Sequence, residues 1–338
     1  MTERYSRQTL FSPIGQQGQE KIRSSRVAII GCGALGSVSS EMLTRAGIGH
    51  LKLIDRDFVE ENNLQRQSLF TEEDVREGLP KVIALQRALQ KINSDVDTEA
   101  NIEDLNSDNI EQLCQNSHLI LDGTDNFETR FLINDFSVKK SIPWIYGACV
   151  GSYGVSLAFQ PKVTACLQCL FDQTPEIGTV DTCDTVGILS PVVHVVSAYQ
   201  VTQVMKLLVG QPPTPKILKV DVWKGIWRTI EAVKALDPNC CCCGKRQFRF
   251  LDGKEKTRLT RLCGRNAVQI SPRHRISVDF EKLSRRLERS IRVNFNEYIM
   301  RIRVNGYDIV LFADGRSIVR GTEDFAEARA VCAKYLGT

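Results

Sequence analysis

Residues 26–36 read RVAIIGCGALG, a short aliphatic run that ends in the pattern G-x-G-x-x-G. The stretch at 37–49 is typical of a helix that closes on glycine, and HLKLID at 50–55 is typical of a second strand. A strand, a helix and a strand within about thirty residues predict a βαβ unit, which implies a parallel sheet.

The alternation of helical and strand patterns continues along the chain. Further helices are predicted near 80–92, 128–140 and 191–209, and further strands at 118–125, 143–154, 217–223 and 228–235. We therefore predict a Rossmann-like, doubly wound α/β fold with a mainly parallel sheet, which occupies residues 1–250.

The pattern changes after a charged joint at 253–259. DFEKLSRRLERS is typical of a helix, residues 298–321 alternate like strands with turns at Asn305-Gly306 and Asp314-Gly315, and a last helix follows Thr322. We predict a small α+β appendage at 259–338, with no function that the sequence reveals.

Composition excludes several classes of protein. The chain has 338 residues, 42% hydrophobic and 25% charged, and a net charge of +4, which is too mild for a nucleic-acid-binding protein. Its most apolar stretch, at 191–210, is interrupted by polar residues and too broken to span a bilayer. A polar start without a secretory signal and twelve cysteines predict a reducing, cytoplasmic location.

The glycines of GCGALG indicate a nucleotide site. Gly31, Gly33 and Gly36 allow the backbone to approach a phosphate at a helix N-terminus. Asp55, at the end of the next strand, is suited to accept hydrogen bonds from ribose hydroxyls. An NAD-dependent oxidoreductase would show the same features, so this loop alone leaves the nucleotide open.

Charged residues downstream favour ATP. DRDFVEENNLQRQ at 55–67, Lys81 in LPK, and DGTDNFETR at 122–130 bring carboxylates, amides, an arginine and a lysine to the ends of predicted strands. Phosphoryl groups need cations around them, and Mg²⁺ prefers hard oxygen ligands. This set therefore favours magnesium and ATP over nicotinamide.

Two cysteine pairs predict a zinc site. CLQC at 166–169 has the CxxC spacing, and within PNCCCCG at 238–244 only the first and last cysteines repeat it. The predicted ligands are Cys166, Cys169, Cys240 and Cys243. Four thiolates leave no open position, so the zinc would be structural and would pin the late segment to the middle of the fold. Cys241 and Cys242 are predicted not to be ligands.

Taken together, these motifs resemble a known family. RYSRQ at 4–8, GCGALG, DRDFVEENNLQRQ, LPK and DGTDN, followed by two CxxC pairs, resemble the ThiF/MoeB branch of the ubiquitin-activating enzymes over residues 4–244. The resemblance implies a homodimer that uses ATP and Mg²⁺ to adenylate the C-terminal glycine of a ubiquitin-fold sulfur carrier protein, releasing pyrophosphate. The predicted zinc site matches that of the family.

The resemblance also implies roles for individual residues. The three glycines would line the ATP site, Asp55 would hold the ribose, and Asp125 would hold the magnesium. Arg7 would reach into the ATP site of the partner subunit. The expected phosphate contacts are Asn63, Arg66 and Lys81. Asp57 and Asn126 complete the expected cofactor-binding set.

Cys183, in VDTCDTVGILSP, matches the crossover-loop cysteine of the family. By that resemblance it would attack the acyl-adenylate or carry an acyl-linked sulfur intermediate with the carrier. Asp181 and Asp184 flank Cys183 and would raise the pKa of its thiol, so a catalytic role and a loop thiol without one are both left open. No rhodanese-like segment is evident, which implies a separate persulfide donor.

Three alternatives concern the substrate and the activity. NFETRF, IPWIYGACVGSYG and LCGRNAVQI resemble ThiF of Gram-positive bacteria, which favours a ThiS-like carrier of thiamine synthesis over a MoaD-like carrier of molybdopterin synthesis. An oxidoreductase would leave Arg66, Lys81, Asp125 and the cysteine pairs unexplained. The intact Arg7 and the same three residues count against a non-catalytic adaptor that only binds a carrier.

Overall fold

The computed structural model describes residues 3–171, 183–232, 236–253, 259–262, 266–271, 277–287 and 293–336. The chain divides into two compact units. One comprises residues 1–180 and 186–256, and the other comprises residues 181–185 and 257–338.

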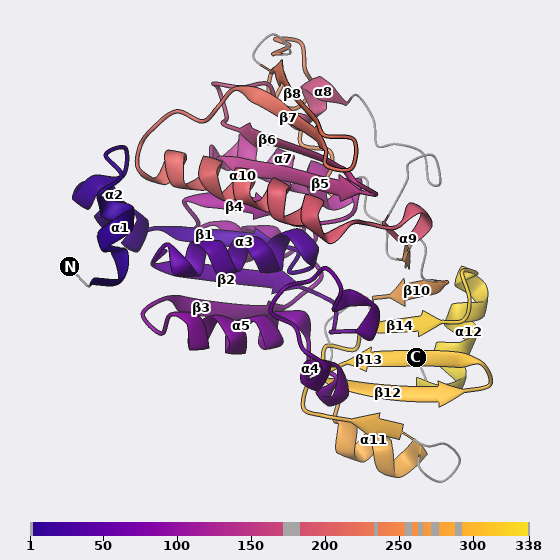
Figure 1. Ribbon diagram of the computed structural model, residues 1–338. Coiled ribbons are helices and arrows are strands. Elements are labelled where there is room, and N and C mark those ends of the chain that lie inside the picture. The colour runs from indigo at the N-terminus through magenta and orange to yellow at the C-terminus, as the bar shows by residue number, and fades with distance from the viewer. Residues whose placement is uncertain are drawn as a thin grey trace. The chain divides into compact units, whose positions relative to one another are not determined.

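An eight-stranded sheet forms the centre of the first unit (Figure 1). Its strand order is β3-β2-β1-β4-β5-β6-β7-β8, in which β3 to β5 are parallel neighbours and β6, β7 and β8 follow antiparallel. The strands are β1 (Arg26–Ile30), β2 (His50–Asp55), β3 (Asp97–Ile102), β4 (Leu119–Asp122), β5 (Trp144–Val150), β6 (Tyr153–Phe159), β7 (Lys216–Asp221) and β8 (Ile226–Glu231). The predicted α/β fold with a mainly parallel sheet is confirmed.

Helices cover both faces of this sheet, as its buried strands require. α3 (Ala34–Arg45), α5 (Lys81–Ile92) and α10 (Ser190–Leu208) pack together on one face, and α7 (Phe127–Lys140) covers the other with α6 (Ile110–Cys114). The shorter helices are η1 (Glu3–Tyr5), α1 (Ser6–Thr9), α2 (Gly15–Arg23), η2 (Glu61–Asn63), α4 (Glu72–Glu77), α8 (Leu167–Leu170) and α9 (Cys183–Val186).

The first strand shows why the sequence forms a central strand. Four of the five residues of β1 are buried, because successive side chains point to opposite faces and both faces carry helices. Ala28 and Ile30 enter the core under α7, where Phe131 and Phe136 are fully buried. β1 pairs in parallel with β2 on one side and with β4 on the other, which places the carboxyl ends of these three strands at one edge.

The prediction of one strand over 143–154 was wrong. The chain turns at Gly151, whose φ of 58° lies in the left-handed region, and returns as β6 so that Trp144 pairs with Phe159. Both strands of this hairpin are apolar, so hydropathy did not reveal the reversal between them. The last strand, β8, also starts and ends earlier than predicted, and residues 233–235 of that prediction lie outside the described residues.

The second unit contains an antiparallel sheet with the order β11-β12-β13-β14-β10-β9. Its elements are β9 (Leu259–Leu262), β10 (Ala267–Ile270), α11 (Phe280–Leu287), β11 (Val293–Phe295), β12 (Ile299–Val304), β13 (Tyr307–Phe312), β14 (Ser317–Arg320) and α12 (Phe325–Leu336). α11 and α12 supply Phe280, Leu287 and Val331 to the core that covers one face of the sheet. The predicted turn at Asn305-Gly306 is confirmed, since both residues have positive φ and join β12 to β13.

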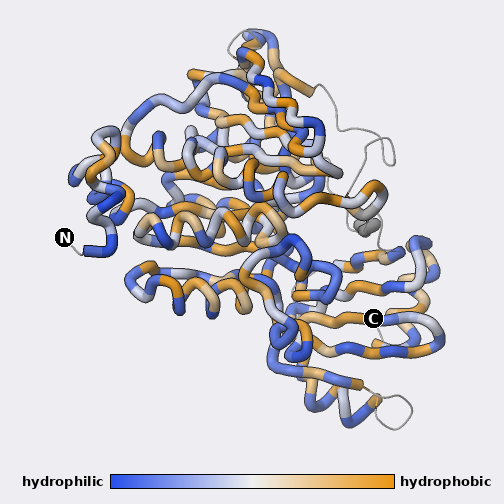
Figure 2. The backbone as a smooth tube through the Cα atoms, viewed as in Figure 1, coloured by the Kyte–Doolittle hydropathy of each residue, from blue (hydrophilic) through white to orange (hydrophobic). Residues whose placement is uncertain are grey.

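Hydrophobic and polar residues are interleaved along the helices of the first unit (Figure 2), as expected of helices that pack one side against a sheet. Within the described ranges, no helix is both long enough and apolar enough to cross a membrane.

Candidate active site and metal centre

The loop after β1 packs its backbone directly against the loop after β4. A Cβ atom at Gly36 would lie 1.9 Å from the carbonyl oxygen of Gly31, and one at Gly123 would lie 2.4 Å from the same oxygen. Gly31 itself has a φ of 84°. These three positions therefore require glycine for close packing as well as for any approach to a phosphate.

Gly33 immediately precedes α3 and has a different environment. A Cβ atom there would meet nothing closer than 3.7 Å, where the Nε2 atom of Gln67 lies. No side chain caps the first turn of α3, so its N–H groups remain available to an anion. Gln67 is buried, and its Oε1 atom has no hydrogen-bond partner within the described part of the chain. Gln67 ends the stretch 55–67 that the sequence analysis singled out, but of the amides in that stretch only Asn63 was assigned to the site.

Asp55 ties the glycine loop to the end of β2. Its Oδ2 atom accepts a hydrogen bond of 2.6 Å from the backbone N–H of Cys32, and its Oδ1 atom accepts one of 2.7 Å from that of Asp57. Burial raises the pKa of Asp55, and the nearby Lys81 ammonium opposes this rise. Each carboxylate oxygen keeps a further lone pair for a ribose hydroxyl.

Lys81 is a buried cation at the start of α5. It is 3% exposed, and its Nζ atom lies 3.1 Å from the Oδ2 atom of Asp57. The backbone N–H of Lys81 also donates to the carbonyl oxygen of Asp57, over 2.9 Å. The structure therefore places Asp57, predicted to bind the cofactor, as the partner that holds Lys81 beside Asp55.

Asn63 and Arg66 lie in and just after η2. Asn63 is buried, and its side chain joins Glu60 and Asn62 in a local hydrogen-bond network. Arg66 is half-buried and donates from Nη1 to the carbonyl oxygen of Asn62, over 2.8 Å. Both side chains thus form hydrogen bonds within one short turn, and these bonds fix their positions.

The end of β4 carries Asp125 and the start of α7. Asp125 is exposed. Burial lowers the pKa of Arg56 and of Arg130, but nearby acidic groups outweigh it and raise both: Asp104 and Asp57 act on Arg56, Tyr146 and Asp122 act on Arg130, and Asp125 adds a smaller contribution to each. Asn126 accepts a hydrogen bond from the backbone N–H of Thr129 and so caps α7, a structural role that the sequence analysis did not separate from cofactor binding.

Arg130 is a further buried cation that the sequence analysis missed. Its guanidinium donates to the Asp122 carboxylate over 3.1 Å and to the carbonyl oxygens of Thr124 and Gly147 over 2.7 and 3.0 Å. The sequence signal that could have revealed Arg130 is its position. It stands four residues after Asn126, so both residues lie at the start of one helix. These bonds fix the loop on which Asp125 stands.

Arg7 lies away from these residues within its own chain. It is exposed in α1, and the neighbouring Gln8 side chain donates to the carbonyl oxygen of Ala46, at the C-terminal end of α3. The glycine loop lies at the other end of α3, which has 12 residues and a length of about 18 Å. The structure thus does not bring Arg7 to Gly33 in one chain.

Cys183 begins α9 and is half-buried. It groups with residues 181–185 and the second unit, whereas the glycine loop belongs to the first. Residues 172–182, including Asp181, lie outside the described residues. The covalent role of Cys183 stays a prediction.

The four predicted zinc ligands come together. The Sγ atoms of Cys166, Cys169, Cys240 and Cys243 all lie within 4.8 Å of one another. Three of these separations are 3.8, 3.6 and 3.4 Å. A tetrahedral ion with Zn–S bonds of about 2.3 Å places its sulfur ligands about 3.8 Å apart, so this donor set fits zinc.

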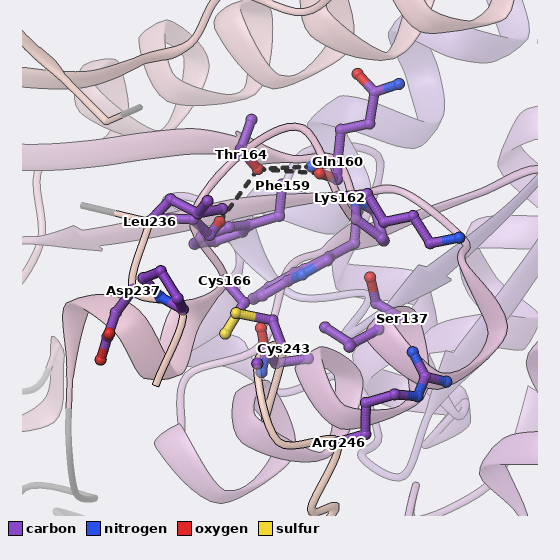
Figure 3. Close-up of a pocket in the computed structure, with 17 residues that line it drawn as sticks. Ser137, Phe159, Gln160, Lys162, Thr164, Cys166, Leu236, Asp237, Cys243 and Arg246 are labelled. Atoms are coloured by element: carbon purple, nitrogen blue, oxygen red, sulfur yellow. Dashed lines mark hydrogen bonds between the residues drawn. The ribbon is translucent and has the colours of Figure 1, made fainter. Parts of the chain in front are cut away.

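The charge around the cluster also suits a metal. Neighbouring thiols and burial raise the pKa of Cys169 and of Cys243 to about 12, so four thiolates would not coexist without a cation. A cavity of about 180 Å³ borders the cluster, with Lys162 and Arg246 in its lining (Figure 3).

Known proteins resemble this chain in sequence and in fold. The sulfur carrier protein ThiS adenylyltransferase of Bacillus subtilis is 45% identical over 338 residues, the full length of both chains. A sulfur carrier protein adenylyltransferase of Thermus thermophilus is 32% identical and covers 72% of this chain and 90% of its own. A crystal structure of E. coli MccB with ATP matches with a TM-score of 0.63 and 25% identity, covering 72% of this chain and 75% of that one. The ThiF family model matches residues 5–242, and the chain belongs to the ThiF family.

Proposed function

We propose that this protein is an ATP-dependent adenylyltransferase that activates the C-terminal glycine of a ThiS-like sulfur carrier protein. The observation that carries this proposal is the buried Lys81, held by Asp57 beside the glycine loop. A nicotinamide enzyme has no phosphoryl transfer that needs such a cation, whereas adenylation builds negative charge at this position. The similarity to a ThiS adenylyltransferase along the whole chain supports the choice of carrier.

The chemistry follows from the arrangement of charges. The carrier carboxylate attacks the α-phosphorus in line, a new O–P bond forms, and the bond to pyrophosphate breaks. Lys81 and Arg66 would stabilise charge on the phosphoryl oxygens and on the leaving pyrophosphate, and Asn63 would orient it. Asp125 would hold Mg²⁺, which when bound neutralises part of the triphosphate charge. No proton transfer by a side chain is needed.

The remaining groups have supporting roles. Asp55 would hold the ribose through the lone pairs that Cys32 and Asp57 leave free. The four cysteines would hold Zn²⁺, which when bound joins the two parts of the first unit that carry them. A separate persulfide donor would supply sulfur after adenylation, and Cys183 is the candidate thiol for that later step.

The test is a carrier reaction. The purified protein is mixed with ATP, Mg²⁺ and either the ThiS-like or the MoaD-like carrier of the same host, and carrier-AMP is detected by intact mass. We expect AMP on the ThiS-like carrier and none on a version that lacks its last glycine. Reaction of the MoaD-like carrier alone would indicate that the protein acts in molybdopterin synthesis. Reaction of neither carrier would contradict the proposal.

A shared active site can be tested by complementation. If Arg7 acts in the partner's site, a mixed dimer of Arg7→Ala and Asp125→Asn contains one site with every required group. Each variant alone is expected to lose at least ~100-fold in rate, and mixing after dissociation is expected to restore up to about a quarter of wild-type activity. Mixing Arg7→Ala with itself is the control. An inactive mixture with proven subunit exchange would place Arg7 outside the partner's site.

A further inference from the structure

The CxxC spacing predicts Cys240 and Cys243 as ligands, but the run also contains two further thiols, Cys241 and Cys242, between them. Its thiols are chemically identical and adjacent, and the chain turns tightly through them, with the N–H groups of Gly244 and Lys245 both donating to the carbonyl oxygen of Cys240. Cys240 and Cys243 face the metal cluster. The Cys242 side chain contacts Cys166 on one side and the Asp135 carboxylate of α7 on the other, so it is a competitor for the metal at close range.

The competing thiol is held away from the metal position by α7. Cys242 is fully buried, and its Sγ atom accepts a hydrogen bond of 3.3 Å from the Nδ2 atom of Asn134. Asn134 is itself fully buried, and its Oδ1 atom accepts a hydrogen bond of 2.8 Å from the backbone N–H of Leu167. A single amide thus joins Cys242 to the residue that follows Cys166.

The next residue of α7 anchors the chain beyond the run. The Oδ2 atom of Asp135 accepts hydrogen bonds from the backbone N–H groups of Phe250 and Leu251, at 2.9 and 3.3 Å. The helix therefore holds the cysteine run both at Cys242 and just after it. Rotation of the run to present a different pair of thiols would break the bond to Asn134 while these anchors stay in place.

We propose that Asn134 is a positioning residue that fixes the register of the cysteine run, holding Cys242 against α7 so that Cys240 and Cys243 reach the metal. The inference rests on the proposed metal site and not on the carrier reaction. It assigns Cys242 a role as hydrogen-bond acceptor, and it makes α7 the element that keeps Cys242 from replacing Cys240 as a ligand.

The test is alkylation mapping of the zinc-loaded protein. N-ethylmaleimide is added, and the labelled positions are located by tandem mass spectrometry. In the wild-type protein we expect label on Cys241 and protection of Cys240 and Cys243 until a chelator is added. Asn134→Leu keeps the branching and the number of side-chain heavy atoms and removes both hydrogen bonds. In this variant we expect either Cys240 or Cys242 to bind the metal, so that Cys240 takes up at least ~10-fold more label than in the wild-type protein.

Two further variants separate register from general destabilisation. Adding Cys242→Ala to Asn134→Leu removes the competing thiol. Cys240 and Cys243 are then expected to be protected from N-ethylmaleimide again, as in the wild-type protein. A merely structural defect would not be rescued in this way. With Asn134 intact, Cys240→Ala is expected to lose at least ~10-fold in zinc affinity, because Cys242 remains held. Wild-type protection in Asn134→Leu, or full zinc affinity in Cys240→Ala, would overturn the proposal. The second measurement stands even if Asn134→Leu does not fold.

Discussion

Replacing Lys81 with methionine is expected to lower the single-turnover rate of carrier adenylation by at least ~100-fold, equivalent to about 2.7 kcal/mol of transition-state stabilisation. Lys81 is buried, and its ammonium is held 3.1 Å from the Asp57 carboxylate. The ammonium also lowers the pKa of Asp55, which burial raises. A cation in such a water-poor position acts on phosphoryl charge more strongly than an exposed one. Methionine keeps an unbranched side chain that is one atom shorter, and it removes the ammonium with its charge and its N–H donors.

The same helix offers a matched control. Lys91 stands in the last turn of α5 and is exposed, so Lys91→Met is expected to react at the wild-type rate. Because Lys81→Met leaves the Asp57 carboxylate without its lysine, the double variant Lys81→Met/Asp57→Asn is also needed, with thermal unfolding of all variants. Recovery of the wild-type rate in the double variant would mean that Lys81 only compensates Asp57 and takes no part in phosphoryl transfer.

Removal of the metal is expected to cost about 4 kcal/mol of unfolding free energy and to lower Tm by about 10 °C. The four thiols join α8 to the run at 240–243, and they form one cluster with Val138 and Phe248. Without a cation, nothing bonds the two cysteine pairs to each other. The remaining contacts alone must then hold the pairs together and offset the entropy lost on closing the long chain segment between them. The measurement is thermal unfolding with and without a chelator, together with metal analysis.

Two serine variants locate the effect within the cysteine run. Cys243→Ser is expected to bind little metal and to unfold near the temperature of the chelated protein. Cys241→Ser, which replaces a half-buried thiol outside the cluster, is expected to stay within about 1 kcal/mol of the wild type. An unchanged Tm after complete metal removal would show that the cluster contributes nothing to stability.

The sequence by itself determined the local elements and the family. The run RVAIIG, the glycines after it and HLKLID predicted a βαβ unit, and β2 has the bounds that its six letters indicated. The CxxC spacing predicted which four thiols would gather, and the structure brings these four together. The βαβ unit depends on hydrogen bonds and packing between near neighbours, so its signal lies in short patterns. The metal cluster joins pairs that are 74 positions apart, but each pair carries its own CxxC spacing, which a short pattern reveals.

Only the tertiary structure decided matters that depend on distant pairing. It showed that residues 143–154 reverse direction and that Asp57 holds Lys81. It also brought Gln67 to the glycine loop and Asn134 to Cys242, 108 positions apart in the chain. A side chain's partner depends on how the sheet orders its strands and on which helix then covers them. That order is set by burial and strand pairing over the whole unit, and no short stretch of residues carries it.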